Sequence, residues 1–295
     1  MDDVHLRALI GERHPLSSPD ALRHAEGYLA DHFRDLGLEV SRHSFTALGD
    51  TYRNVIATLP MSAPALPPLI IAAHYDTVQG SPGADDNASA LAVMLEVARC
   101  LRDVSLNREA RFIAFCLEEE NLLGSLAYVS GLREAKQEIC GAIVLECVGY
   151  ARSDEGSQRT PPTGRGASWR AWGGRVQKMP VAVPTVGDFL AIVGSAASAK
   201  LVATVEGGAK EHVPDLKTVS LLVPGNGELL PDTRRSDHAT FWHHGYQAVM
   251  LTDTANFRNP HYHAATDTIE TLNLGFMERV ARTVTATVMD LCAAS

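Results

Sequence analysis

Imidazole and carboxylate side chains follow an apolar run near the first quarter of the chain. Residues 69–73 are apolar, His74 ends the run, and Asp76 follows two residues later. A loop of Gly, Ser and Pro then leads through Asp85 and Asp86 into a helical apolar pattern. Imidazole nitrogens and carboxylate oxygens bind divalent metals, so this stretch predicts part of a metal site.

Three later positions offer the same kinds of ligand. Glu118 and Glu119 come after the apolar run 110–117, and Glu146 interrupts the apolar run 141–148. His263 follows the last predicted strand. A charge inside an apolar run must be paired or bind a metal. Sites in parallel sheets form beyond the carboxyl ends of strands, so we expect these residues to gather there.

The elements that must position these residues alternate between strands and helices. Apolar runs predict strands at residues 40–45, 52–59, 69–73, 110–117, 141–148, 188–193, 219–223 and 248–251. Apolar periodicity and capping residues predict helices at 18–37, 87–101, 124–132, 196–205, 236–244 and 274–293. This alternation predicts an α/β fold with three α/β/α layers and a central mixed, mostly parallel sheet.

We expect a single catalytic domain over residues 1–295. Its first part, residues 1–60, is predicted to hold a helix and a hairpin at the sheet edge. Residues 151–186 are polar and rich in Gly, Pro and Arg, which is typical of a long surface loop inserted between elements.

Composition excludes several classes of partner. The net charge of −9 argues against nucleic acid or an anionic membrane surface. No apolar run approaches the roughly 20 residues that span a bilayer. Residues 1–13 lack the layout of a secretory signal, which predicts a cytoplasmic chain or a secreted one whose signal has been removed. The five cysteines are scattered, so we expect buried thiols rather than a thiolate site. A monomer is compatible with these features.

Five short motifs, in this order and at these spacings, resemble the zinc aminopeptidase and glutamate carboxypeptidase family (metallopeptidase family 28). They are His74-Tyr-Asp, Gly83-Ala-Asp-Asp-Asn-Ala-Ser, Glu118-Glu followed by Leu-Leu-Gly-Ser, Ser236-Asp-His-x-x-Phe, and Tyr262-His-x-x-x-Asp-Thr. The resemblance covers nearly the whole chain from His74 to the closing helix, and it implies the zinc exopeptidase-like fold, of the phosphorylase/hydrolase-like type.

The resemblance also implies two zinc ions and a ligand set. Asp86 would bridge the ions, His74 and Glu146 would hold one of them, and Glu119 and His263 would hold the other. Each ion then keeps an open position for water or substrate, as catalytic zinc requires. Two ions about 4 Å apart can activate one water and polarise the scissile carbonyl.

Three further roles follow from the same resemblance. Glu118 matches the general base that takes a proton from water and passes it to the leaving amine. Asp76 matches the acid that orients His74, and Tyr262 matches a tyrosine that donates to the tetrahedral oxyanion. A cis peptide is expected at Asp86-Asn87, while Asp85 is expected to be a loop or helix-start residue.

The predicted activity is that of a dinuclear zinc exopeptidase acting on peptides, most simply an aminopeptidase. A carboxypeptidase or dipeptidase of the same family is an alternative, which would need a basic pocket built from Arg258, Arg234, Arg235 or loop arginines. A glutaminyl cyclase, with one zinc and three ligands, is a second alternative. A metal-binding protein without turnover is a third, although a structural site has no use for a free base such as Glu118.

Overall fold

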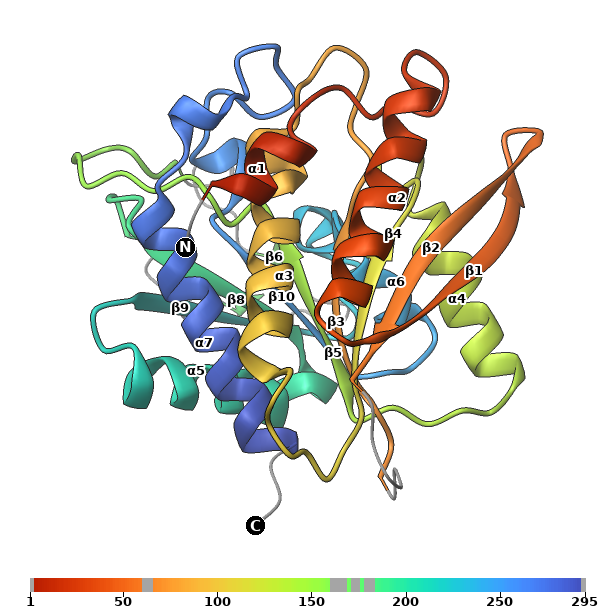
Figure 1. The fold of residues 1–295 in the computed structure, drawn as a ribbon. Coiled ribbons are helices and arrows are strands. Elements are labelled where there is room, and N and C mark those ends of the chain that lie inside the picture. Colours follow the sequence, from red (N-terminus) through yellow and green to blue (C-terminus); the bar gives the residue numbers. More distant parts are fainter. Residues whose placement is uncertain (1–2, 60–65, 160–168, 171–175, 178–183, 293–295) are drawn as a thin grey trace.

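An eight-stranded sheet with helices on both faces organises the fold (Figure 1). The computed structural model describes residues 3–59, 66–159, 169–170, 176–177 and 184–292. The strands of the sheet are β1 Glu39–Ala47, β2 Asp50–Thr58, β3 Leu69–His74, β4 Ala110–Phe115, β5 Gly141–Glu146, β8 Phe189–Ser195, β9 Lys217–Val223 and β10 Ala248–Thr252. Their order is β1-β2-β4-β3-β5-β10-β8-β9, and β6 (Trp169–Arg170) and β7 (Val176–Gln177) form a separate two-stranded ribbon.

The middle of the sheet is parallel. Strands β4, β3, β5 and β10 lie side by side and run in the same direction, while β2 and β8 pair antiparallel at either side of them. Every residue of β3 is buried. A strand that is covered on both faces must be apolar on both, which explains its unbroken run Leu-Ile-Ile-Ala-Ala before His74.

Helices form one layer on each face of the sheet. One layer contains α1 Val4–Leu9, α2 Pro19–Asp35, α3 Ala90–Leu101, α5 Ala199–His212 and α7 Leu274–Cys292. The other contains α4 Leu123–Glu134 and α6 His238–His243. Two apolar cores, one on each side of the sheet, result from this arrangement. The predicted three-layer fold with a mixed, mostly parallel sheet is therefore confirmed.

The chain changes direction around β3. It leaves β3 through α3 and reaches β4 on one side, then returns through α4 on the opposite face to β5 on the other side (Figure 1). The two crossovers diverge at the carboxyl end of β3, which is where open α/β sheets form their binding crevice. His74 is the last residue of this strand.

Two predicted strands end earlier than their apolar runs. The run 110–117 stops being a strand at Phe115 and the run 141–148 stops at Glu146. Leu117 and Cys147 have positive φ values of 62° and 47°, and a residue in this left-handed region cannot continue a strand. The backbone therefore turns at the positions where Glu118 and Glu146 face the crevice.

The N-terminal region contains the predicted helix and edge hairpin, together with a helix that the sequence did not predict. Strands β1 and β2 pair antiparallel at the edge of the sheet, as expected. The additional helix is α1, which has only six residues. Of the predicted surface loop 151–186, residues 160–168, 171–175 and 178–183 lie outside the described residues. Among the helices described, none has both the length and the apolar character needed to cross a bilayer.

Candidate metal centre

The predicted ligands meet at the carboxyl ends of β3, β4, β5 and β10. His74 Nε2 lies 3.2 Å from Asp86 Oδ1 and 3.4 Å from Glu146 Oε2. His263 Nε2 lies 3.0 Å from Asp86 Oδ2 and 3.3 Å from Glu119 Oε1. The carboxylate of Asp86 thus has one oxygen beside each imidazole, and the five side chains form two adjoining groups of three.

The orientation of Asp86 is set by its neighbours in the turn η1 (Ala84–Ser89). The Asp86-Asn87 peptide is cis, as the family resemblance led us to expect. The amide of Asn87 donates to Leu145 O at 3.1 Å and accepts from the backbone N–H of Cys147 at 3.0 Å, which ties the turn to the end of β5. Both contacts are made with the residues on either side of Glu146. The same hydrogen bonds of Asn87 therefore fix the positions of Asp86 and Glu146 relative to each other.

Asp267 was not predicted to act in the site. Its carboxylate accepts hydrogen bonds from the backbone N–H of Asp85 at 2.9 Å and of Asp86 at 3.2 Å. Asp267 belongs to the Tyr-His-x-x-x-Asp-Thr motif, four residues after His263, and that spacing was the available signal. It connects the loop that carries His263 to the turn that carries Asp86.

Asp76 supports the site mainly through the backbone. Its two carboxylate oxygens accept from the N–H groups of Glu118 and Glu119, each at 3.0 Å. Nδ1 of His74 lies 3.2 Å from the main-chain oxygen of Asp76 and 3.6 Å from its carboxylate. The residue therefore contacts His74, as expected, and also fixes the loop that presents both glutamates.

Glu118 lies beside the two groups without joining the shortest contacts. Its Oε2 is 4.0 Å from His74 Nε2, and 8% of the residue is exposed. Burial raises the pKa of Glu118 well above its usual range, and the nearby charge of Glu146 adds to this. Burial also raises the pKa of Glu119 to about 7, with Asp86 contributing.

These atoms fit zinc as a donor set. His74 Nε2, Asp86 Oδ1 and Glu119 Oε1 are buried and make no hydrogen bond of good geometry to any described residue. Buried polar atoms without partners are rare and costly, and buried carboxylates need a neutralising charge. Imidazole and carboxylate groups, with two ligands and a shared bridge on each side, match catalytic zinc.

Tyr262 lies at the rim of this cluster. Its ring stacks on His263, with ring centroids 3.8 Å apart. The hydroxyl oxygen accepts a hydrogen bond from Arg235 Nη2 at 3.2 Å, and the guanidinium of Arg235 also lies over the ring, 5.6 Å from its centroid. Because Tyr262 accepts this bond, its own O–H remains able to donate.

Ser236 is a further support that the sequence did not single out. Its hydroxyl donates to Glu146 Oε2 at 2.8 Å, and the residue is fully buried. It precedes Asp237, a buried residue that occupies the N-cap position of α6 without a side-chain capping bond. The Ser-Asp-His motif was visible in the sequence, but the contact of its serine with Glu146 was not.

Asp85 and Arg258, whose roles the sequence left open, make contacts outside the group of proposed ligands. The carboxylate of Asp85 accepts from Gly149 N at 2.8 Å and from Asn259 Nδ2 at 2.7 Å, and it belongs to none of the metal-ligating groups found among the described residues. Arg258 is buried, donates to Gln158 Oε1 at 2.9 Å, and lies over the Phe189 ring. Asp85 is thus a supporting residue at the turn, and Arg258 contributes little to a basic pocket.

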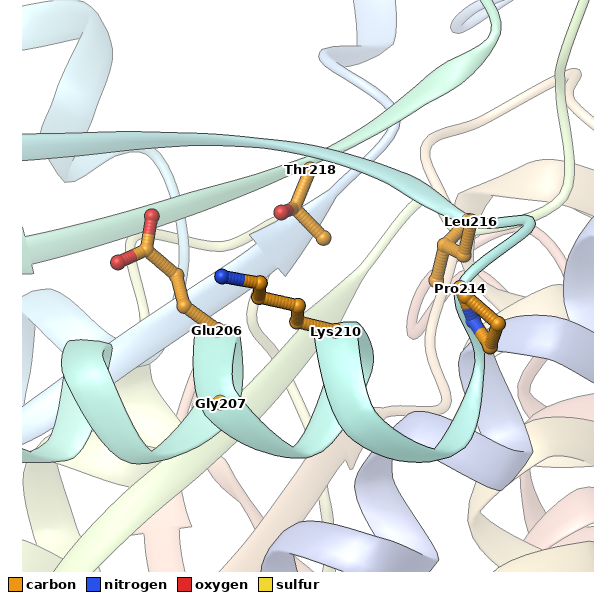
Figure 2. A pocket seen from close by; sticks show the side chains of 6 residues that line it. All are labelled: Glu206, Gly207, Lys210, Pro214, Leu216 and Thr218. Atoms are coloured by element: carbon orange, nitrogen blue, oxygen red, sulfur yellow. The ribbon is translucent and has the colours of Figure 1, made fainter.

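A cavity of about 430 Å³ lies away from this cluster, between α5 and β9 (Figure 2). The side chains of Glu206 and Lys210 rise from α5 toward the strand, and Leu216 and Pro214 close one end. None of its lining residues belongs to a metal-ligating group of the described chain. The cavity is therefore not part of the proposed metal site.

Comparison with known proteins agrees with the fold and identifies the family. The model of the family described as "Peptidase family M28" matches residues 54–178 and 191–288. The chain therefore belongs to peptidase family M28, and it is a zinc metallopeptidase and hydrolase, as the sequence predicted.

Three proteins are similar to this chain in sequence or in fold. An uncharacterised protein of Escherichia coli, YfbL, is 33% identical over 93% of this chain and 83% of its own length. A solved structure of BSAP, a zinc aminopeptidase from Bacillus subtilis, has 26% identity and a TM-score of 0.60 over 84% of this chain and 52% of that chain. The glutaminyl cyclase of Porphyromonas gingivalis has a TM-score of 0.68 over 97% and 94% of the two chains, at 17% identity, which shows a shared fold alone. This chain spans about half the length of that aminopeptidase.

Proposed function

We propose that this chain is a dinuclear zinc aminopeptidase, which releases residues from the N-terminus of peptides. The observation that carries the proposal is the placement of Asp86, whose two oxygens lie 3.2 Å and 3.0 Å from the nitrogens of two different imidazoles. In the proposed arrangement Asp86 would be shared by two ions. His74 and Glu146 would hold the first ion, and Glu119 and His263 would hold the second.

The remaining roles follow from position and protonation. When bound, the zinc ions supply Lewis acidity toward the attacking water and the scissile carbonyl. Glu118 accepts the proton of the water and delivers it to the leaving amine, because its buried carboxylate lies beside the proposed ligands, 4.0 Å from His74 Nε2, without joining their shortest contacts. The O–H of Tyr262 donates to the oxygen that becomes negative in the transition state.

The basic groups near the cluster bear on which end of the substrate binds. The four carboxylates of Asp86, Glu118, Glu119 and Glu146 would balance the charge of the two proposed ions and do not select either end. A carboxypeptidase needs a guanidinium for the substrate carboxylate, and Arg258 is buried against Phe189. The name of the similar zinc aminopeptidase supports the choice of an aminopeptidase.

A panel of substrates tests this proposal. The panel contains amino-acid anilides with a free amine, their N-acetylated counterparts, and N-blocked dipeptides, each with and without a chelator. We expect hydrolysis of the free-amine anilides alone, and its loss with the chelator. Cleavage of the blocked dipeptides would indicate a carboxypeptidase, and cyclisation of an N-terminal glutamine peptide would indicate a cyclase. No turnover in a chain that binds metal would indicate a binding protein.

Metal analysis gives an independent measurement. Two divalent ions per chain are expected, because five ligands with a shared carboxylate can hold two ions. A reproducible single ion would contradict the dinuclear centre and favour the cyclase alternative.

A further inference from the structure

The N-terminal segment, residues 3–13, reaches the metal centre although it lies outside the region matched by the family, which begins at residue 54. Helix α1 packs against the turn η1, and its Leu6 and Leu9 are buried. The chain then leads to Arg13, whose exposed fraction is only 2%. A buried guanidinium is unusual enough to require a specific explanation.

Arg13 donates its hydrogen bonds to main-chain oxygens. Nε donates to Tyr75 O at 2.7 Å, Nη1 to Pro82 O at 3.2 Å, and Nη2 to Gly83 O at 3.2 Å. Two further carbonyls, of Leu9 and Gly11, accept from Nη1. The planar guanidinium has five N–H donors in a fixed fork, and here the fork spans two separate parts of the chain.

The backbone of the same segment strengthens this connection. The N–H of Arg13 donates to Thr77 Oγ1 at 2.9 Å, and the N–H of Gly11 donates to Pro82 O at 2.8 Å. The loop of residues 75–83 is therefore tied to the N-terminal segment at both of its ends. The side chain of Arg13 alone reaches both ends of the loop, at Tyr75 O and at Gly83 O.

The proposed metal ligands His74 and Asp86 lie on either side of this loop. Tyr75 stands between His74 and Asp76, while Gly83 precedes Asp86 by three residues. The packing around Gly83 is tight: its φ is 63°, and an added Cβ would lie 2.9 Å from Arg13 Nη2 and 2.5 Å from Asp86 O. A displacement of the guanidinium would thus move the backbone on which both ligands depend.

We propose that Arg13 is a positioning residue that holds His74 and Asp86 at the separation needed to bind zinc. The proposal rests on the ligand roles of these two residues under the proposed function. Arg13 touches neither metal ligand through its own side chain and acts through the backbone at Tyr75 and Gly83. It makes the N-terminal segment a functional part of the metal centre.

The charge of Arg13 and its hydrogen bonds predict opposite effects on zinc affinity when the residue is replaced, so a measurement of affinity distinguishes the two. A guanidinium near the site repels a divalent cation, so removing the charge alone would tighten zinc binding. Loss of the fork would free the two loop ends and weaken zinc binding. Groups that hydrogen-bond directly to metal ligands are typically worth about 10- to 100-fold in metal affinity, and we expect the indirect support by Arg13 to lie at the lower end of this range.

The experiment measures the free zinc concentration at half occupancy, by titration against a competing chelator, for wild type, Arg13→Met and Arg13→Lys. We expect both variants to need about 10-fold or more free zinc. Lysine keeps the charge but has only three donors and no fork, so it should not rescue binding. Arg7→Met is the matched control, because Arg7 is exposed on α1 and pairs with Asp3; its zinc affinity should equal that of wild type.

The stability of the metal-free proteins separates positioning from folding. Thermal unfolding with chelator reports the fold alone, and a variant that unfolds earlier there but binds zinc normally would overturn the proposal. Zinc binding by Arg13→Met that equals or exceeds wild type would overturn it as well. If that variant fails to fold, Thr77→Val is the alternative, because it removes only the acceptor of the Arg13 N–H. We expect a smaller loss of zinc affinity for this variant. An unchanged affinity would count against the proposal.

The experiments distinguish failure of the proposed function from failure of the positioning role of Arg13. A wild-type chain that binds a single zinc contradicts the dinuclear centre. The effect of Arg13→Met on that remaining ion still tests the positioning role, since the loop end at Tyr75 or at Gly83 would carry one of its ligands.

Discussion

The two adjacent glutamates of the cluster differ in how closely they approach the imidazoles, although both belong to possible metal-ligating groups. Glu118 and Glu119 are adjacent, and Asp76 holds both of their N–H groups. Yet Glu119 lies 3.3 Å from His263 Nε2, whereas Glu118 lies 4.0 Å from His74 Nε2. Two neighbouring glutamates with the same support therefore have different surroundings, which is how one fold assigns separate roles to like groups.

Glu118→Gln tests this separation directly. The amide keeps the shape of the side chain but cannot accept a proton, so kcat should fall by about 10²- to 10⁴-fold while both zinc ions stay bound. Steady-state kinetics and metal analysis on one preparation measure the two quantities. Glu120→Gln is the control: this acid is the next residue and pairs with His14, at 3.4 Å, away from the cluster. Equal activity of Glu118→Gln and wild type would rule out the general-base role.

Tyr262→Phe tests the oxyanion donor. Loss of one such donor costs about 10²- to 10³-fold in kcat, with little change in KM, because the bond strengthens in the transition state. Arg235→Met should reduce kcat by about 3- to 10-fold, since it removes the hydrogen bond to the hydroxyl and the guanidinium over the ring but leaves the O–H of Tyr262 in place. A larger effect at Arg235 than at Tyr262 would show instead that the guanidinium contacts the substrate itself.

At the scale of the elements, α4 begins against the end of β4 with almost no free space. A Cβ on Gly124 would lie 2.0 Å from Cys116 O and 2.6 Å from Asn54 Oδ1, whereas a Cβ on Gly131 would meet nothing within 4 Å. Asn54 joins the two elements, because Nδ2 donates to Gly124 O and Oδ1 accepts from Cys116 N. This close approach sets where the loop of residues 116–122 leaves the sheet.

Gly124→Ala and Gly131→Ala form a matched pair in one helix. The first should destabilise the protein by about 1–3 kcal/mol through overpacking. The second should stabilise it by up to about 1 kcal/mol, because alanine is the better helix former at an open position. Urea denaturation of both variants measures the two signs. If both substitutions changed stability in the same direction, the close approach at Gly124 would not be the cause.

The sequence predicted most elements because their signals are local, and it missed those that depend on distant contacts. Strand β3 was evident from five apolar residues before His74. Helix α1 was missed because six residues with two buried leucines give little periodicity. The contacts of Arg13 with carbonyls 62 to 70 residues away leave no spacing to recognise in the sequence.

The same contrast holds for the centre. His74, Asp86, Glu119 and His263 stand in motifs that resemble a family, and Glu146 interrupts an apolar run, so all five could be named as ligands in advance. Their roles stay predictions, while their convergence is a property of the fold. Asp267 and Ser236 lay in the same motifs without a role, because a hydrogen bond to a backbone N–H or to another acid follows from the folded geometry alone.

For the whole molecule, the centre joins segments that are far apart in the sequence. Its proposed ligands come from the ends of β3 and β5, from η1, and from the segments after β4 and β10, so bound metal would connect both halves of the parallel sheet. A ligand that binds only the folded chain stabilises it by about 2.7 kcal/mol at 100 times its dissociation constant. Removal of zinc should therefore lower the melting temperature, and added zinc should restore it.

Calorimetry of the native, chelated and zinc-reloaded protein measures this linkage, with Glu118→Gln as the control. Because that variant keeps every proposed ligand, its melting temperature should fall with the chelator as far as that of wild type. His263→Ala loses a ligand of one group only, so its shift should be smaller and its zinc content lower. A wild-type melting temperature that is the same with and without zinc would mean that the cluster is stable without metal, in which case its buried carboxylates must be neutralised by protons instead.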